Sequence, residues 1–251
     1  MAVWTALATA ARDLLLAETC ACCSAAVAPG PVCPRCQAAI DAMAGTGARG
    51  VHPLAPPQGF PRTLAAADYV GPVRRLLLAH KERATIAAAR PLGRLLAIAV
   101  AAAAAPGGSS CPLVLVPIPS SPGVTRRRGH DPVRRMALVA SRVLDPDRPV
   151  QVVPVLAQAR RVADQSGLSL QQRQANLRHG LTVTRRQWPP SDAWVVLVDD
   201  VCSSGATLAA AAAALRAAGT EPARITAAVV AAPVLLGSRD RWPVPGPDRT
   251  D

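Results

Sequence analysis

The segment from Ala193 to Leu208 carries the densest set of side chains suited to chemistry. Apolar residues 194–198 run into Asp199 and Asp200, then into small and hydroxyl residues, and then into an Ala/Leu block. This order predicts a buried parallel strand, a loop and the N-terminus of a helix. A helix start offers unpaired backbone N–H groups and a partial positive charge, which together favour a phosphate.

The side chains of this loop are suited to a sugar that carries a phosphate. The two carboxylates at the strand end can accept hydrogen bonds from sugar hydroxyls. Gly205 lets the main chain come close to a phosphate, and hydroxyl groups beside it can donate hydrogen bonds. The residues expected at the phosphate are Ser203, Ser204, Gly205, Ala206 and Thr207. The alternative is an ordinary strand–turn–helix unit with a serine cap and nothing bound.

Cysteines near the N-terminus have the spacing of a zinc ribbon. Cys20 with Cys23, and Cys33 with Cys36, form two C-x-x-C pairs separated by nine residues. Four thiolates can surround one tetrahedral Zn²⁺ and leave no open position, which indicates a structural role. Cys22 is undecided, because it can replace Cys23 in another geometry or lie outside the metal set. Disulfides and a redox dithiol are the alternatives, and a reducing compartment favours zinc over both.

The charge balance favours anionic partners. The net charge is +12, and Lys81 is the single lysine among 28 basic side chains, so arginine supplies nearly all of them. Arginine prefers planar, bidentate partners such as phosphates and carboxylates, which points to nucleic acid or phosphorylated small molecules. A GC-rich genome would raise alanine, arginine, glycine and proline together, and we attribute most of the arginine excess to that bias.

Two further basic elements are placed where a ligand can be reached. Arg126, Arg127 and Arg128 lie in a Gly/Pro-flanked loop after a predicted strand, on the edge where α/β folds bind ligands. A pyrophosphate needs this kind of charge neutralisation, and the alternative is a solvated basic loop. Lys81 is expected in the connection between two helices, where a side chain can contact a ligand, and His80 beside it is expected to be solvated.

Apolar periodicity predicts alternating strands and helices over most of the chain. We expect strands over 63–70, 112–119, 151–156, 181–184, 193–199 and 225–233. We expect helices over 2–17, 73–81, 85–105 (with a bend at Pro91), 131–144 (with Asp131 as N-cap), 169–176 and 208–218. The expected units are a helix and zinc-ribbon module (1–48), a Gly/Pro-rich linker (49–62), an α/β domain (63–236) and a disordered tail (237–251).

Hydropathy predicts a soluble, cytoplasmic protein without membrane insertion. No run reaches 18 uninterrupted apolar residues, and the N-terminus lacks the basic region of a signal peptide. The cysteines are therefore expected as reduced thiols that can bind metal.

Several motifs in order resemble the ComF family of type I phosphoribosyltransferase-like proteins. Asp199–Thr207 resembles the phosphoribosyl-pyrophosphate (PRPP) signature, with Ser203-Ser204 where Thr-Thr is usual. The two cysteine knuckles also match, and His130-Asp131 stand where the family has Phe-Asn, while Gln158 stands at one expected arginine. The remaining matches are Tyr69, Gly71 and Lys81; Val116–Pro119 with Arg126–Asp131; and Arg160, Gln165–Ser169 and Arg173–Asn176.

The resemblance implies a mainly parallel sheet with helices on both faces, a zinc ribbon, and binding of PRPP with Mg²⁺. It implies displacement of pyrophosphate from C1 of PRPP by a nitrogen nucleophile that the sequence does not identify. Asp199 and Asp200 would bind the ribose hydroxyls, and Ser203–Thr207 the 5′-phosphate. The pyrophosphate would meet Lys81, Arg126, Arg127, Arg128 and Arg160. No residue stands out as a general base.

The resemblance also implies an alternative function in DNA handling. ComF relatives are associated with uptake of single-stranded DNA during natural transformation, so the alternative is a non-catalytic component that binds single-stranded DNA and a competence helicase. The arginine excess and a zinc module suit a nucleic-acid binder. Against this, few aromatic side chains are present to stack on bases: one tyrosine, one phenylalanine and four tryptophans.

Overall fold

The computed structural model describes residues 18–27, 30–108, 111–120, 130–144, 147–158, 180–184, 188 and 192–234. The helices expected over 2–17 and 169–176 and the tail at 237–251 lie outside these residues. The predicted pyrophosphate ligands Arg126, Arg127, Arg128 and Arg160 lie outside them too.

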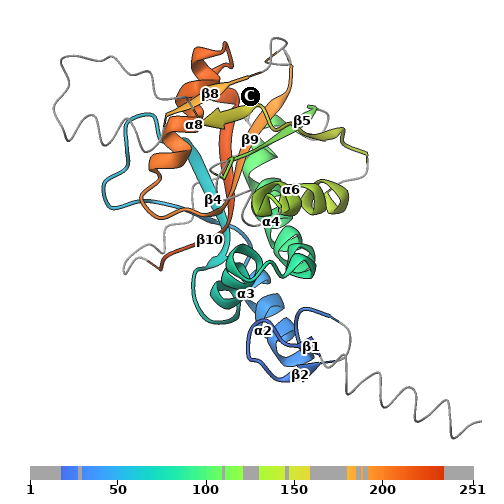
Figure 1. Ribbon diagram of the computed structural model, residues 1–251. Coiled ribbons are helices and arrows are strands. Elements are labelled where there is room, and N and C mark those ends of the chain that lie inside the picture. Colours follow the sequence, from blue (N-terminus) through green and yellow to red (C-terminus); the bar gives the residue numbers. More distant parts are fainter. Residues whose placement is uncertain are drawn as a thin grey trace, which may run out of the picture.

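A six-stranded, mainly parallel sheet forms the centre of the molecule (Figure 1). Only β3 runs antiparallel, against β4. The chain passes from β5 outward to β6 and then returns to β9 on the other side of β5, so the strand order reverses between β5 and β9. Open α/β sheets bind ligands outside the carboxyl ends of the strands at such a point. In spatial order the strands are β3 (Arg49–Gly50), β4 (Arg62–Asp68), β10 (Ile225–Ala232), β9 (Trp194–Val201), β5 (Leu113–Pro117) and β6 (Val150–Val152).

Helices cover both faces of this sheet (Figure 1). Alternate residues of β9 serve the two layers: Val196 and Val198 pack into one apolar cluster, and Val195 and Leu197 into the other. Burial on both faces explains the uninterrupted apolar runs in the strands. The first layer contains α2 (Pro34–Ala44), α3 (Gly71–Glu82), α4 (Ala89–Ala104) and α6 (Pro132–Val143); the second contains α8 (Ala206–Ala217) and the antiparallel pair β7 (Leu156–Gln158) and β8 (Leu181–Val183).

The first layer is built around α4, which the 3₁₀ turns η1 (Ile86–Ala88) and η2 (Ala105–Gly107) extend at both ends. By length and composition the segment Ile86–Gly107 is apolar enough to cross a membrane, but here it is a core helix that packs against both the sheet and α6. A Cβ on Gly93 would lie 2.4 Å from the Val139 Cβ, so glycine permits the close approach of α4 and α6. Pro91, where a bend was predicted, lies in the first turn of α4, directly after the 3₁₀ turn η1, and at this position no helical N–H is lost.

Two predicted strands end elsewhere in the structure. The strand expected over 151–156 is divided, because Pro154 cannot donate to a ladder: β6 joins the main sheet, and β7 pairs with β8. The strand expected over 193–199 continues to Val201, whose pairing with Ala231 of β10 extends the parallel ladder. Helix α6 matches the prediction, and the Asp131 carboxylate accepts a hydrogen bond from the Arg134 amide as its N-cap.

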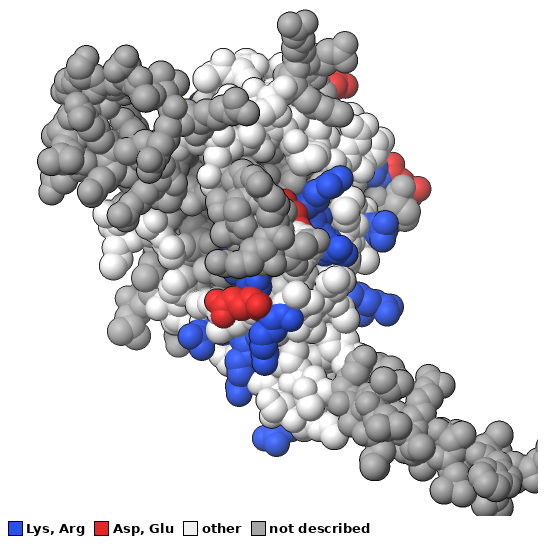
Figure 2. Space-filling model, in the orientation of Figure 1, with Lys and Arg blue, Asp and Glu red and all other residues white. Residues whose placement is uncertain are grey.

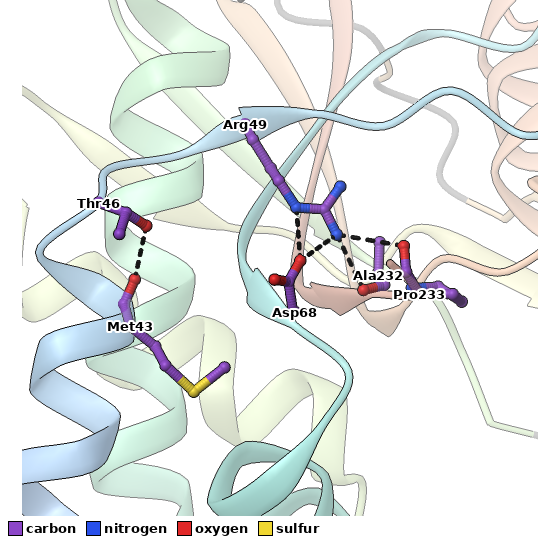
Figure 3. A network of polar contacts seen from close by, with 6 residues as sticks. All are labelled: Met43, Thr46, Arg49, Asp68, Ala232 and Pro233. Carbon is purple, nitrogen blue, oxygen red and sulfur yellow. Dashed lines mark hydrogen bonds and ion pairs between the residues drawn. The ribbon is translucent and has the colours of Figure 1, made fainter. Parts of the chain in front are cut away.

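The N-terminal module lies next to α3, at the lower end of the molecule in Figure 1. It contains the antiparallel pair β1 (Glu18–Thr19) and β2 (Ala26–Val27), followed by α2. After α2, the segment expected as a linker forms β3, and Arg49 on this strand binds the carboxyl ends of two others (Figure 3). Its guanidinium donates to Asp68 Oδ1 at 2.8 Å and to the carbonyls of Ala232 and Pro233 at 2.9 and 3.2 Å. The start of this segment is therefore fixed to the sheet.

Candidate functional site

The two acids occupy the carboxyl end of the central strand β9, beside the point where the strand order reverses. Each carboxylate accepts a hydrogen bond from the next backbone amide: Asp199 Oδ1 from Asp200 at 2.8 Å, and Asp200 Oδ1 from Val201 at 2.8 Å. Because strand residues alternate, Asp200 faces the layer of α3 and Asp199 faces the layer of α8. The two acids therefore face opposite faces of the sheet, at the edge where open α/β sheets bind ligands.

Lys81 forms an ion pair with Asp200, from its ammonium to the Oδ2 atom. Lys81 lies in the last turn of α3, which ends at Glu82, so it belongs to the helix expected over 73–81 and not to the connection after it. The Asp200 side chain is 7% exposed and that of Lys81 is 37% exposed, so the carboxylate is buried and the lysine is partly open to water. The structure thus joins two predicted site residues that are distant in sequence.

The environment of Asp199 disfavours its charged form. Burial raises the pKa of this carboxyl well above its ordinary value, and the neighbouring Asp200 carboxylate raises it further. The charge of Lys81 lowers the pKa of Asp199 but does not cancel the other effects. A ligand whose hydroxyl groups donate to this carboxylate would relieve the unfavourable charge.

The loop after β9 begins with a buried residue and continues with exposed ones. Cys202, the first residue of this loop, is buried, and burial together with the charge of Asp199 raises the pKa of its thiol to about 11, which disfavours the reactive thiolate. Gly205 has φ +77°, and a Cβ there would lie 2.5 Å from the Phe60 ring. The expected role of Gly205 was close approach to a ligand; the structure adds a conformational and packing reason that needs no ligand. Ser203 and Ser204 are exposed.

The start of α8 has the features of an anion site. Its N-cap is Gly205 rather than a serine, and no side chain caps it, although Ser204 Oγ lies 3.4 Å from the Ala206 amide. Within the part of the chain that the structure describes, no group accepts a hydrogen bond from the amides of Thr207 and Leu208. The first turn also contains no acidic residue. These amides and the hydroxyls beside them suit a phosphate.

The predicted basic loop begins and ends at this site, although residues 121–129 are not described. On its N-terminal side, the Ile118 amide donates to the Val198 carbonyl of β9 at 2.9 Å. On its C-terminal side, the His130 ring centroid lies 5.3 Å from that of His80, the neighbour of Lys81. Both described ends therefore contact the elements that carry Asp200 and Lys81.

Sequence reasoning missed the role of His80, which it predicted to be solvated. The side chain is buried, with Nδ1 3.1 Å from the Thr85 carbonyl and Nε2 3.3 Å from the Pro132 carbonyl. Burial lowers the pKa of His80, while its two carbonyl contacts act to raise it. The ring joins the end of α3 to the start of α6, and in its neutral form it can donate a hydrogen bond to only one of the two carbonyls. The apolar residues around it in α3 are a weak signal of this burial.

The four predicted metal ligands form one cluster. The sulfurs of Cys20, Cys23, Cys33 and Cys36 all lie within 4.8 Å of one another, and Cys23 and Cys33 are 3.7 Å apart. Zn–S bonds of about 2.3 Å in a tetrahedron give sulfur separations of about 3.8 Å, so the donor set fits zinc. All seven cysteines are free thiols.

The protein environment already favours a thiolate in this cluster. Burial acts to raise the pKa of Cys20, but backbone hydrogen bonds, foremost from Cys33, lower it to about 6. Burial and the neighbouring sulfurs raise the pKa of Cys36, so a thiolate at this residue needs a cation nearby. A bound Zn²⁺ would supply that charge.

Cys22 lies outside the metal set, which decides the choice that the sequence left open. Its thiol donates to the Pro72 carbonyl of α3 at 3.4 Å, and its side chain is buried. Burial and the charge of Cys20 raise the pKa of Cys22 to about 11, which keeps it a thiol. It contacts the α/β body instead of the metal position.

Comparison with known proteins adds no assignment: no family model matches the chain, and no curated protein matches it. The function must therefore be argued from the site itself.

Purified under reducing conditions, the protein should contain about one equivalent of zinc by elemental analysis, because four thiolates close a single tetrahedral site. Cys33→Ala should lose the metal, whereas Cys22→Ala should keep it. A zinc content below a few tenths of an equivalent, or equal loss in both variants, would contradict this assignment.

Asp199→Asn should stabilise the protein at neutral pH, by roughly the 0.5–2 kcal/mol typical of such substitutions, because it removes an unfavourable charge and keeps an acceptor for the Asp200 amide. The carboxyl pKa is raised in the folded state, so wild-type stability falls as pH rises from the ordinary value of 3.8 through the raised value. The gain should therefore be small near pH 4 and full above the raised pKa, as measured by denaturant unfolding. Equal stability of the two proteins at pH 8 would refute the explanation, and Asp192→Asn, at an exposed position, is the control.

Proposed function

We propose that the chain is a type I phosphoribosyltransferase-like protein of the ComF family that binds the magnesium complex of PRPP. One observation carries the proposal: a carboxylate pair at the end of the central strand is followed directly by exposed hydroxyls and the uncapped start of α8. Donors for a phosphate thus stand next to acceptors for sugar hydroxyls, in the order that a 5-phosphorylated ribose requires. The proposed reaction is transfer of the phosphoribosyl group to a nitrogen nucleophile.

Different residues would bind different parts of PRPP. Asp199 and Asp200 accept hydrogen bonds from the ribose 2′ and 3′ hydroxyls. The backbone and hydroxyls of Ser203–Thr207 hold the 5′-phosphate, whose charge the dipole of α8 favours. Positive side chains would offset the charge that develops on the departing pyrophosphate, and the Mg²⁺ that arrives with PRPP would share this task.

The ion pair of Lys81 with Asp200 suits a change of partner on binding. A ribose hydroxyl can replace the ammonium as hydrogen-bond donor to Asp200. The ammonium is then available to the pyrophosphate, which was the role predicted from the sequence. In such an exchange the Asp200 carboxylate keeps a hydrogen-bond donor, and the phosphates bring the negative charge that Lys81 requires.

Asp200→Asn should weaken binding of PRPP in the presence of Mg²⁺ by at least tenfold in titration calorimetry, because it removes the charged acceptor for a ribose hydroxyl. Asp192→Asn, at an exposed position away from the strand end, should bind as the wild type does. Unchanged affinity of Asp200→Asn would reject the ribose assignment. If the wild type binds PRPP and Asp200→Asn does so more weakly, a screen for PRPP-dependent pyrophosphate release with candidate bases would identify the acceptor.

A second candidate function rests on the distribution of arginine. Figure 2 shows basic side chains gathered over the side of the molecule that carries α3, α4 and α6. Many of them are exposed, and they come from α3 with its C-cap, from α4 and from α6. The exposed ones are Arg74, Arg75, Arg83, Arg90, Arg94 and Arg134. A surface of this kind attracts a polyanion such as single-stranded DNA. The candidate is a nucleic-acid-handling component that binds single-stranded DNA and a competence helicase.

The combined substitution of Arg74, Arg75 and Arg94 by alanine should reduce the salt dependence of binding to a single-stranded oligonucleotide. Each phosphate contact contributes about 0.7 to the slope of log K against log salt, so the loss should be about 2. Fluorescence anisotropy over a salt series measures it, with Arg224→Ala, outside this surface, as control. An unchanged slope, or no binding by the wild type, would exclude the DNA function for this surface.

A further inference from the structure

The knuckle between Cys20 and Cys23 contacts both ends of helix α3. The Cys22 thiol donates to the carbonyl of Pro72, in the first turn of α3, at 3.4 Å. The guanidinium of Arg83, the C-cap residue of α3, donates to the Ala21 carbonyl at 2.8 Å. Two adjacent residues of the N-terminal module are thus hydrogen-bonded to the beginning and to the end of a single helix.

The same helix contains Lys81, which forms the ion pair with Asp200. Its apolar side chains hold it in the first layer of the core, since Val73, Leu76 and Leu77 are buried there. Apolar packing is non-directional, so it permits small slides along the helix axis and small rotations. Directional hydrogen bonds at the helix ends remove that freedom, and an ion pair is lost when its atoms separate by a few ångström.

The position of the knuckle depends in turn on the cysteine cluster. Ala21 and Cys22 lie between two of the candidate zinc ligands, and the Cys22 amide donates to the Cys20 sulfur at 3.4 Å. A metal ion that binds Cys20 and Cys23 would fix the backbone between them. Without the ion, this backbone would depend on hydrogen bonds such as that from the Ala21 amide to the Pro31 carbonyl at 2.9 Å.

We propose that Cys22 and Arg83 are positioning residues, through which a metal bound by the four cysteines holds α3 so that Lys81 reaches Asp200. Metal binding in the N-terminal module therefore controls the charge arrangement of the candidate ligand site. The proposal concerns the ion pair and does not require that PRPP is the ligand, so it can fail or succeed independently of the proposed function.

The single lysine of the chain permits a direct test. In protein grown with ¹⁵N- and ¹³C-labelled lysine, one set of side-chain NMR signals reports on Lys81, and Asp200→Asn defines their position when the pair is broken. Cys22→Ala should move these signals at least halfway to that position while zinc content stays at one equivalent. Cys22→Ser, which keeps a donor for the Pro72 carbonyl, should leave them near the wild-type position. Removal of zinc by a chelator should reproduce the shift seen in Cys22→Ala.

A second variant keeps the test valid if Cys22→Ala does not fold. Arg83→Ala lies away from the sulfurs and should move the Lys81 signals in the same direction, whereas Arg94→Ala removes an exposed charge of α4 and should not. Lys81 signals that stay at the wild-type position in zinc-loaded Cys22→Ala or Arg83→Ala would overturn the proposal. Equal shifts in Arg83→Ala and Arg94→Ala would also overturn it, since the effect would then be one of net charge.

Discussion

The ion pair between Lys81 and Asp200 is the interaction on which the arrangement of the site depends. It joins a helix of one layer to the central strand and places a cation beside two carboxylates. Removing one partner of a fully buried pair costs about 3–5 kcal/mol, whereas exposed pairs contribute about 0–1 kcal/mol. This pair lies between the two cases, because Asp200 is buried and Lys81 is partly exposed. It is strong enough to organise the free site and weak enough for a ligand to replace.

The rest of the fold confines a ligand to one part of the sheet edge. At the carboxyl ends of β4 and β10, Arg49 binds Asp68 and two carbonyl groups, so the protein fills that part of the edge itself (Figure 3). At β9 and β5 the edge carries the acids, the exposed serines and the segment that leads to residues 121–129. The N-terminal module contributes from outside the sheet, through its hydrogen bonds to α3. The contacts of Arg49 and the candidate ligand site thus lie at neighbouring but separate parts of the same sheet edge.

Much of this organisation is predictable from the sequence, because it depends on local patterns. The apolar runs and the acid pair predict β9, and C-x-x-C spacing predicts the sulfur cluster. What depends on partners distant in sequence was not predicted. The continuation of β9 to Val201 follows from its pairing with β10, and the role of Cys22 follows from a carbonyl of α3.

Other predictions were wrong or incomplete because the residue type concerned is compatible with two different structural roles. Pro154 lies within an apolar run that looks continuous by hydropathy, but it divides β6 from β7 because it has no N–H. His80 is polar and was predicted to be exposed, yet it is buried, where a carbonyl can accept the hydrogen bond of its ring N–H. Gly205 was assigned to a ligand, while its left-handed conformation and the Phe60 ring also require glycine.

The central claim is that a phosphorylated ribose binds where β9 meets the start of α8. The most direct measurement is a crystal structure of the protein with PRPP and Mg²⁺. The account predicts ribose hydroxyls at Asp199 and Asp200, the 5′-phosphate at residues 203–207, and Lys81 moved from Asp200 to the pyrophosphate. Ligand density at another place, with this edge empty and the Lys81–Asp200 pair intact, would contradict it.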